Sequence, residues 1–286
     1  MKIVAFHAKD GPRLGILTSA DVIDLSAVDP TAPRDLKDVI ENNQIMALNE
    51  IAQKAKAEHR LDYEALNFDI PVKNAGKILC LGLNYIDHVN EGIFEKQPYP
   101  TIFTRSYTSL TPHNSPLIRP LASVQLDYEA ELALVIGKTC KHLTAETALD
   151  AVAGYTCSND GSVREFQRHT VQWTMGKNFD QTGSIGPVFL TPDELPDGAT
   201  DLKIECRLNG SVVQSSNTNM MMFPVIETLV YLTQGITLQP GDIILMGTPS
   251  GVGHARTPQL WMKQGDIVEV EIERVGVLRN TVEDEQ

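Results

Sequence analysis

Cysteine is scarce in this chain, and no two cysteines have a metal-binding spacing. The 286 residues contain four, at positions 80, 140, 157 and 206, and none of them forms a C-x-x-C pair. Neither a disulfide framework nor a structural zinc site is therefore indicated. Thiols of this kind belong by default to a reducing compartment, so we expect a cytoplasmic location.

Long apolar runs and basic clusters are also lacking. The N-terminal stretch is polar and rich in turn residues by its ninth position, unlike a signal peptide or a membrane span. The chain has 24 Lys and Arg against 37 Asp and Glu, a net charge of -13. This charge repels nucleic acid and anionic lipid surfaces, so we expect neither nucleic acid nor membrane as a partner.

A length of 286 residues allows one large domain, or one large and one small. The apolar fraction of 42% is that of an ordinary globular core. Residues 1–70 predict a small α+β domain. It opens with a hairpin of KIVAF and LGILT around the turn Lys9 to Pro12, and a surface helix follows from Ile45 to Ala57. The polar, proline-bearing stretch from Asn67 to Lys77 predicts a linker into a main domain over residues 71–286.

The stretch LDYEAELALVI, from Leu126 to Ile136, alternates strictly between apolar and other residues. As one strand it would turn its apolar side chains to one face and Asp127, Glu129 and Glu131 to the other. Carboxylates two positions apart lie about 7 Å apart, and burying them together raises their pKa values unless a cation compensates. A metal is the simplest such cation. The alternative is an edge strand with a solvated acidic face.

Two further side chains stand where they could join such a site. Asp160 follows a predicted strand from Gly154 to Asn159, where it could complete a metal site or only cap the short helix after it. Lys177 lies between a glycine and an aromatic residue in an irregular segment. It could face a pocket or be an ordinary solvated lysine.

His88 and Glu91 are three positions apart after a short apolar strand from Ile78 to Leu83. If residues 85–92 are helical, the two side chains are neighbours, and the glutamate orients the imidazole and raises its basicity. A general base needs this arrangement. A surface ion pair is the alternative.

The C-terminal half is rich in predicted strands. Asn209-Gly210 predicts a type I′ hairpin, residues 223–232 a helix, residues 243–246 a buried strand, and residues 266–272 and 275–279 two alternating strands. The loop from Gly247 to Gly253 has backbone amides that could hold a carboxylate or phosphate, although it lacks the lysine of a P-loop. A tight turn is the alternative for this loop.

Taken together, these segments resemble the fumarylacetoacetate hydrolase family from about Lys77 to Thr281. The first 70 residues look more loosely like the small domain that precedes the catalytic domain in bacterial-type members. The motifs that carry the resemblance occur in the family's order: KILCLGLNYIDHVNE, LDYEAELALVIGK, GYTCSNDGSVREFQ, WTMGKNFD, the NG hairpin, QPGDIILMGTPSGVG and GDIVEVEIERVGVLRN.

The resemblance implies an α+β fold, a mixed β-sandwich roll with peripheral helices, usually in a homodimer. The run from Met220 to Phe223 is apolar, as either a core or an interface would be. The resemblance also implies a divalent metal held by Glu129, Glu131 and Asp160. Three oxygen ligands suit Mg²⁺ or Mn²⁺, whereas zinc prefers nitrogen or sulfur.

Other roles carry over by motif as expectations. The family's catalytic H-x-x-E pair and lysine match His88, Glu91 and Lys177, and its substrate contacts match Gln167 and Thr248. The stretch FTRSYTSLTPHNSPL departs from the family's K/R-x-P-S-like substrate loop, in which Arg105 and Ser109 are the residues that could correspond.

The implied reaction is metal-dependent hydrolysis of a carbon–carbon bond in an acylpyruvate or a related 2,4-diketo acid. His88 would deprotonate the attacking water, Lys177 and the metal would stabilise the enolate that leaves, and Thr248 with its loop would hold a carboxylate. Decarboxylation of oxaloacetate, or interconversion of its enol and keto forms, is the alternative on the same site. A non-catalytic metal-binding protein of this fold is a third.

Overall fold

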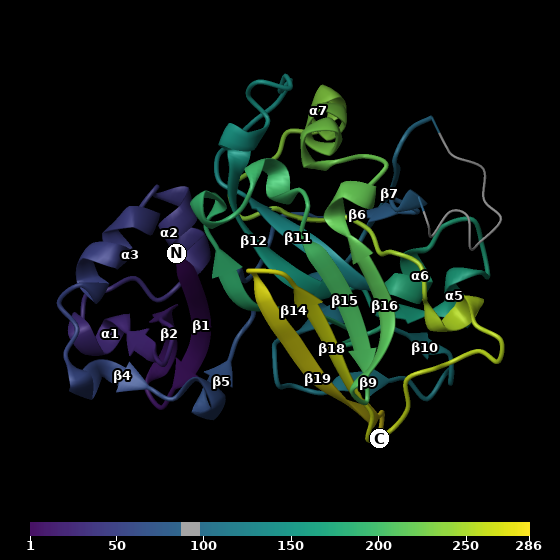
Figure 1. Cartoon of the computed structure of the whole chain (residues 1–286), viewed down its shortest axis with the longest axis horizontal. Helices are drawn as coiled ribbons and strands as arrows, with labels where there is room; N and C mark the ends of the chain where they lie inside the picture. The colour runs from purple at the N-terminus through teal and green to yellow at the C-terminus, as the bar shows by residue number, and fades with distance from the viewer. Residues whose placement is uncertain (87–97) are drawn as a thin grey trace.

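The computed structural model describes residues 1–86 and 98–286, so the predicted His88 and Glu91 pair lies outside the described residues. A smaller N-terminal unit of strands and short helices lies at one side of a larger body built mainly of sheets (Figure 1). Within the described residues, no helix is long and apolar enough to cross a membrane.

The N-terminal unit begins with the predicted hairpin, in which β1 and β2 pair antiparallel. The helix predicted to reach Ala57 ends at Ala52, because the residues after it add no buried apolar side chain to its inner face. The unit consists of β1 (Lys2–Ala8), β2 (Gly11–Leu17), β3 (Val22–Asp24), α1 (Leu25–Val28), α2 (Leu36–Glu41), α3 (Ile45–Ala52) and β4 (Arg60–Leu61).

The predicted linker from Asn67 to Lys77 is in fact part of the packed structure. Its first residues form β5 (Asn67–Phe68), which pairs with β1, and Ile70 and Val72 are buried in the core. Along the same edge of β1, opposite β2, residues 2–4 pair with β14 (Gly183–Leu190), so the N-terminal sheet continues into the main body (Figure 1). The first half of the predicted linker is therefore packed into the fold, while the domain boundary between residues 70 and 71 stays a prediction.

Two large mixed sheets make up most of the described structure, in agreement with the expected α+β roll, and β10 and β13 form a small third one. One of the two large sheets runs in the order β4-β3-β2-β1-β14-β12-β11-β17-β6-β7, with β5 and β8 at its side, and the other in the order β16-β15-β18-β19-β9. The bounds are β6 (Ile78–Gly82), β7 (Thr101–Thr104), β8 (Leu110–Thr111), β9 (Leu117–Arg119), β12 (Val152–Asn159), β15 (Lys203–Leu208), β16 (Ser211–Asn217), β17 (Ile243–Leu245), β18 (Ile267–Ile272) and β19 (Gly276–Asp284).

The predicted strand from Leu126 to Ile136 is divided in two. Its start is β10 (Leu126–Asp127), which pairs with β13 (Ser162–Val163), and its remainder is β11 (Ala130–Ile136), between β12 and β17. Within β11 the alternation is confirmed, since residues 132, 134 and 136 enter one core cluster and residues 133 and 135 another. Both faces are buried, which excludes the solvated edge strand.

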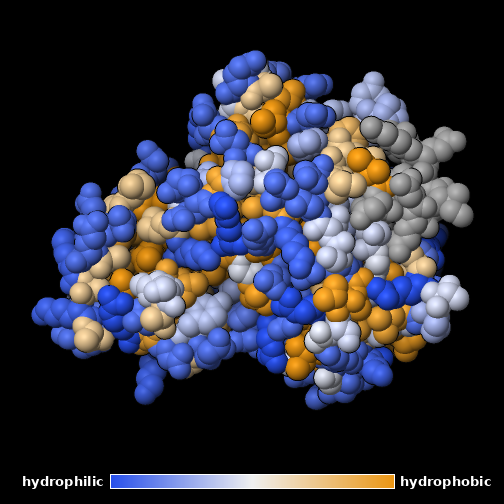
Figure 2. Space-filling view, in the orientation of Figure 1, coloured by the Kyte–Doolittle hydropathy of each residue, from blue (hydrophilic) through white to orange (hydrophobic). Residues whose placement is uncertain are grey.

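The C-terminal predictions are largely confirmed. Asn209 and Gly210 both have positive φ, at 51° and 77°, as a type I′ turn requires. The predicted helix is α7 (Val225–Gly235). In the apolar run before it Met221 is buried and Met220 is 37% exposed, so the run is at least partly core and the homodimer stays a prediction. The face in Figure 2 is mostly hydrophilic, with its apolar side chains in separate patches.

His113 lies buried where the N-terminal unit meets the second sheet. Its ring packs edge-on against Phe68, with centroids 4.7 Å apart, and its Nδ1 accepts a hydrogen bond from the Arg279 N–H at 3.0 Å. Burial and the nearby Arg279 charge lower the pKa of His113 to about 4. The folded protein therefore holds this imidazole neutral.

This neutral imidazole should make the protein acid-sensitive. The unfolded chain binds a proton near the ordinary pKa of 6.5, so stability is lost as the pH falls from there toward the folded-state pKa. Between pH 7.5 and 5.0 we expect wild type to lose about 2 kcal/mol more of its unfolding free energy than His113→Asn, which keeps an acceptor but does not titrate. Urea denaturation at the two pH values measures this, and equal losses would refute it.

Candidate functional site

The ends of β11 and β12 bring three acidic residues together. The strands pair so that Ala130 lies opposite Asn159, and the Asp160 N–H donates to the Glu129 carbonyl at 2.9 Å. Side-chain oxygens of Glu129, Glu131 and Asp160 lie within 4.8 Å of one another, and all three residues are buried. We call these three residues the carboxylate cluster.

Three cations from different segments surround the cluster. Lys177 Nζ lies 2.5 Å from Glu129 Oε2 and 2.5 Å from Asp160 Oδ2. Arg105 is 2.5 Å from Asp160 Oδ1, and Arg164 is 2.6 Å from Glu129 Oε1. Because these carboxylates lie far from bulk water, their charges require such compensation. The capping role considered for Asp160 is excluded, since its carboxylate is held by cations instead.

Glu131 differs from the other two carboxylates. It accepts a hydrogen bond from the Gly247 N–H at 2.8 Å, but among the described residues no salt bridge reaches it. Burial and the charges of Asp160 and Glu129 raise its pKa well above the ordinary value. A divalent cation fits this place, because the donors are hard oxygens that converge and one carboxylate lacks a positive partner.

Lys177 is the last residue of the short helix α6 (Thr174–Lys177), which packs closely on α5 (Arg164–Gln167). Gly176 permits this approach, because a Cβ there would lie 2.4 Å from the Gln167 backbone. The lysine is only 2% exposed, which excludes the solvated alternative. Burial alone would lower the pKa of Lys177, but Asp160 and Glu129 raise it overall, so the amine is protonated.

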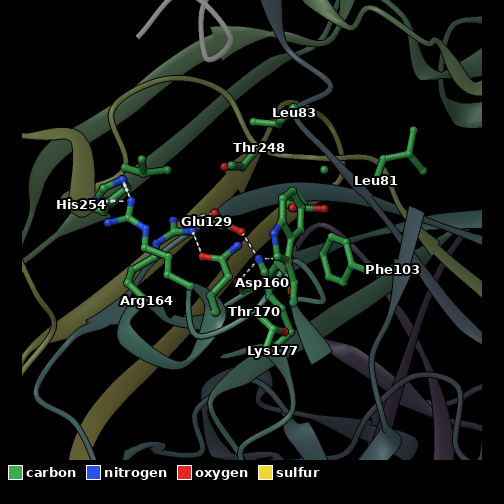
Figure 3. Close-up of a pocket in the computed structure, with 16 residues that line it drawn as sticks. Leu81, Leu83, Phe103, Glu129, Asp160, Arg164, Thr170, Lys177, Thr248 and His254 are labelled. Carbon is green, nitrogen blue, oxygen red and sulfur yellow. Dashed lines mark hydrogen bonds and ion pairs between the residues drawn. The ribbon is translucent and has the colours of Figure 1, made fainter. Parts of the chain in front are cut away.

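A cavity of about 320 Å³ opens onto the cluster. Lys177, Gln167 and Thr248 line it together with the cluster, so these predicted site residues meet in one place (Figure 3). Arg164, Arg168 and His254 also line it. Its apolar wall is formed by Leu81, Leu83, Phe103, Trp173 and Val252.

Arg105 and Ser109 do not line this cavity, although a substrate contact was expected of them. The Arg105 side chain is fully buried, and it binds Asp160, the Gly161 carbonyl at 3.0 Å and Ser109 Oγ at 3.0 Å. The pair therefore lies behind Asp160 and fixes that carboxylate. Sequence alone could not reveal this role, because 55 residues separate Arg105 from Asp160.

The loop after β17 binds carboxylates of the chain itself. Gly247, with φ of 87°, donates its N–H to Glu131, and the N–H groups of Gly253 and His254 donate to Asp127 at 2.8 and 2.9 Å. These three amides are therefore occupied by carboxylates of the chain itself, and ligand binding by the other amides of the loop stays a prediction. Thr248 accepts a hydrogen bond from Gln214 at 2.9 Å.

Asp127 has a different role from the other acids of its stretch. Besides the two amides it binds Arg164 Nε at 2.8 Å, and so connects β10, α5 and the glycine loop. Simple alternation placed it beside Glu129, but the break between β10 and β11 separates it from the carboxylate cluster. Its links to the loop were missed because residue 253 is 126 positions away.

Comparison with known proteins identifies the family. The profile described as fumarylacetoacetate (FAA) hydrolase C-terminal matches residues 77–283, which is most of the chain. The protein belongs to the fumarylacetoacetate hydrolase family. Proteins similar to this chain include hydrolases, isomerases and tautomerases.

Individual relatives resemble the whole chain. The human mitochondrial oxaloacetate tautomerases FAHD2B and FAHD2A are each 40% identical over 290 residues, covering 99% of this chain and 91% of theirs. A fumarylacetoacetate hydrolase from Exiguobacterium antarcticum matches with 32% identity and a TM-score of 0.87. Maleylpyruvate hydrolase from Sphingobium sp. SYK-6, solved with manganese and pyruvate, matches with 28% identity and a TM-score of 0.82. Both structures are covered completely, as is this chain.

If the cluster holds the cation, Glu131→Gln should weaken Mn²⁺ binding by ~100-fold, because one ligand charge is lost. The metal-free variant should melt at the same temperature as wild type or higher, since removing one buried charge relieves repulsion. Titration calorimetry and thermal melts measure the two effects. Glu283→Gln, at an exposed position, is the control and should change neither. Wild-type Mn²⁺ affinity in Glu131→Gln would rule the cluster out.

Proposed function

We propose that this protein is a divalent-metal-dependent enzyme that interconverts the enol and keto forms of oxaloacetate. The observation that carries the proposal is the carboxylate cluster with a protonated lysine in one buried cavity. Such a site suits a 2-oxo acid that passes through an enolate, because positive charge is available where negative charge develops. The 40% identity to oxaloacetate tautomerases over nearly the whole chain favours this reaction among those of the family.

Different residues of the chain would bind the metal, bind the substrate and exclude water. Mg²⁺ or Mn²⁺, held by Glu129, Glu131 and Asp160, would supply a Lewis acid and a template for the 2-oxo acid end. Lys177 Nζ donates a hydrogen bond to the enolate oxygen as its charge grows, and the apolar wall limits the entry of water. Gln167 and Thr248, which also line the cavity, offer hydrogen bonds to the substrate.

Interconversion also needs a group that removes a proton from C3 of the keto form while the 2-oxygen gains one, and that protonates C3 in the reverse direction while the enol oxygen gives its proton to solvent. His88, oriented by Glu91, is our proposal for this base, and it remains a proposal because both residues lie outside the described residues. In the hydrolytic alternative the same imidazole would instead deprotonate water.

Hydrolysis of an acylpyruvate is the second candidate. It is favoured by the likeness to maleylpyruvate hydrolase and by the apolar cavity wall, which could accept an acyl group. Oxaloacetate decarboxylation shares the enolate and is tested in the same assay. A non-catalytic metal-binding protein of this fold is the third alternative, and the absence of any turnover in the assay would favour it. From the family resemblance we further propose a homodimer, and from the four free cysteines a location in the cytoplasm.

We expect the protein with Mg²⁺ to accelerate the loss of enol-oxaloacetate absorbance far beyond the buffer rate, without releasing pyruvate. Lys177→Met, which keeps the side-chain length but not the charge, should lower kcat by ~100-fold or more because the enolate loses its cationic partner. Ultraviolet kinetics measure the enol, and a coupled pyruvate assay detects decarboxylation.

The same preparation should be tested with a panel of acylpyruvates. Slow or absent cleavage agrees with the proposal. Rapid cleavage of acetylpyruvate, together with enol loss no faster than in buffer, would overturn it in favour of the hydrolase.

A further inference from the structure

The cavity wall contains one arginine whose charge the carboxylate cluster does not use. Arg164 has all its nitrogens engaged: Nε by Asp127 at 2.8 Å, Nη1 by Gln167 at 2.9 Å and Nη2 by Glu129 at 2.6 Å. Lys177 is engaged by Glu129 and Asp160. Arg168 lies one helical turn after Arg164, and no carboxylate within residues 1–86 and 98–286 forms an ion pair with it.

The contact that Arg168 does make is with the ring of His254. The backbone of this histidine is fixed, because Asp127 accepts its N–H at 2.9 Å and that of Gly253 at 2.8 Å. Burial, and then the charges of Arg168 and Arg164, lower the pKa of His254, so the ring is neutral near pH 7 and accepts from the guanidinium. His254 therefore orients Arg168 from a rigid loop.

His254, with Arg168 in contact with its ring, lies on a different side of the cavity from Leu81 and Phe103. In Figure 3, His254 and Arg164 are on one side of the carboxylate cluster, and Leu81 and Phe103 are on the other. One wall is thus cationic and the other apolar, with the proposed metal site between them. The cavity, at about 320 Å³, has room for a small acid of a few carbons.

We propose that Arg168, oriented by His254, binds the distal carboxylate of a dicarboxylic 2-oxo acid whose 2-oxo acid end lies at the carboxylate cluster. An arginine fork suits a carboxylate because it donates two parallel hydrogen bonds. An anion there also relieves the crowding of Arg168 with Arg164. The inference rests on the proposed function, since that function places the other end of the ligand, and it makes the distal charge the feature that selects the substrate.

Oxaloacetate and pyruvate form the matched test, because pyruvate has the same 2-oxo acid end and lacks the distal carboxylate. Arg168→Gln should raise the KM for oxaloacetate by ~10- to 100-fold, the value of one or two charge-assisted hydrogen bonds, and change kcat little. The dissociation constant of pyruvate from the Mg²⁺-loaded protein, measured by calorimetry, should not change. Arg168 is exposed, so the variant should fold.

Two further variants separate charge recognition from structural effects. Arg168→Lys keeps the charge and should recover part of the lost KM. Lys141→Gln removes a charge at an exposed position outside the cavity and should leave both ligands unaffected. An unchanged KM in Arg168→Gln, or equal weakening of pyruvate and oxaloacetate, would overturn the inference while leaving the proposed function standing.

Failure of the proposed reaction can also be told apart from failure of the carboxylate site. If wild type does not convert oxaloacetate but binds it more tightly than pyruvate, and Arg168→Gln abolishes that difference, the proposed reaction is wrong and the carboxylate site remains. If wild type binds the two ligands equally, the carboxylate site is wrong whatever the reaction.

Discussion

Burial of like charges in one place is the constraint on which the rest of this structure depends. Asp127, Glu129, Glu131 and Asp160 are all buried, and isolated carboxylates there would be strongly destabilising. The described cations that compensate them are Arg105, Arg164 and Lys177. Glu131, which lines the cavity, is left buried and without a cation among the described residues, and its raised pKa reflects this. Four buried carboxyl groups with three described cations would destabilise a hydrophobic core, but they make the site suitable for a divalent cation.

The fold around the cluster follows from supplying these partners. Arg105 comes from the segment after β7, Arg164 from α5 and Lys177 from α6, and each must reach the junction of β11 and β12. Close packing of α5 on α6 at Gly176 serves this approach, and the turn at Gly247 brings a backbone N–H to Glu131. The residues that would bind the metal are therefore also the residues that form the buried ion pairs. The part of the cavity wall left for a ligand consists of the apolar side chains and of Arg168 with His254.

Sequence reasoning succeeded where the signal is local or belongs to a family motif. The Lys9 to Pro12 hairpin and the Asn209-Gly210 turn are set by turn chemistry, and the members of the carboxylate cluster stand in recognisable motifs. It failed where a partner is distant in sequence. The division of Leu126 to Ile136, the packing of the supposed linker and the use of Arg105 all depend on residues many positions away. The alternation of apolar residues cannot reveal the break between β10 and β11, because side chains of other strands stabilise it. Asn159 and Gln214 accept hydrogen bonds from the backbone N–H groups of Glu129 and Ala130.

The central claim is that the carboxylate cluster holds a divalent cation. Crystals grown with Mn²⁺ and measured at a wavelength where manganese scatters anomalously test it most directly. The account predicts one strong anomalous peak at bonding distance from an oxygen of each of Glu129, Glu131 and Asp160, with Lys177 Nζ displaced from at least one of the carboxylates that it now contacts. A fully occupied peak elsewhere in the protein, with Lys177 still bound to Glu129 and Asp160, would contradict it.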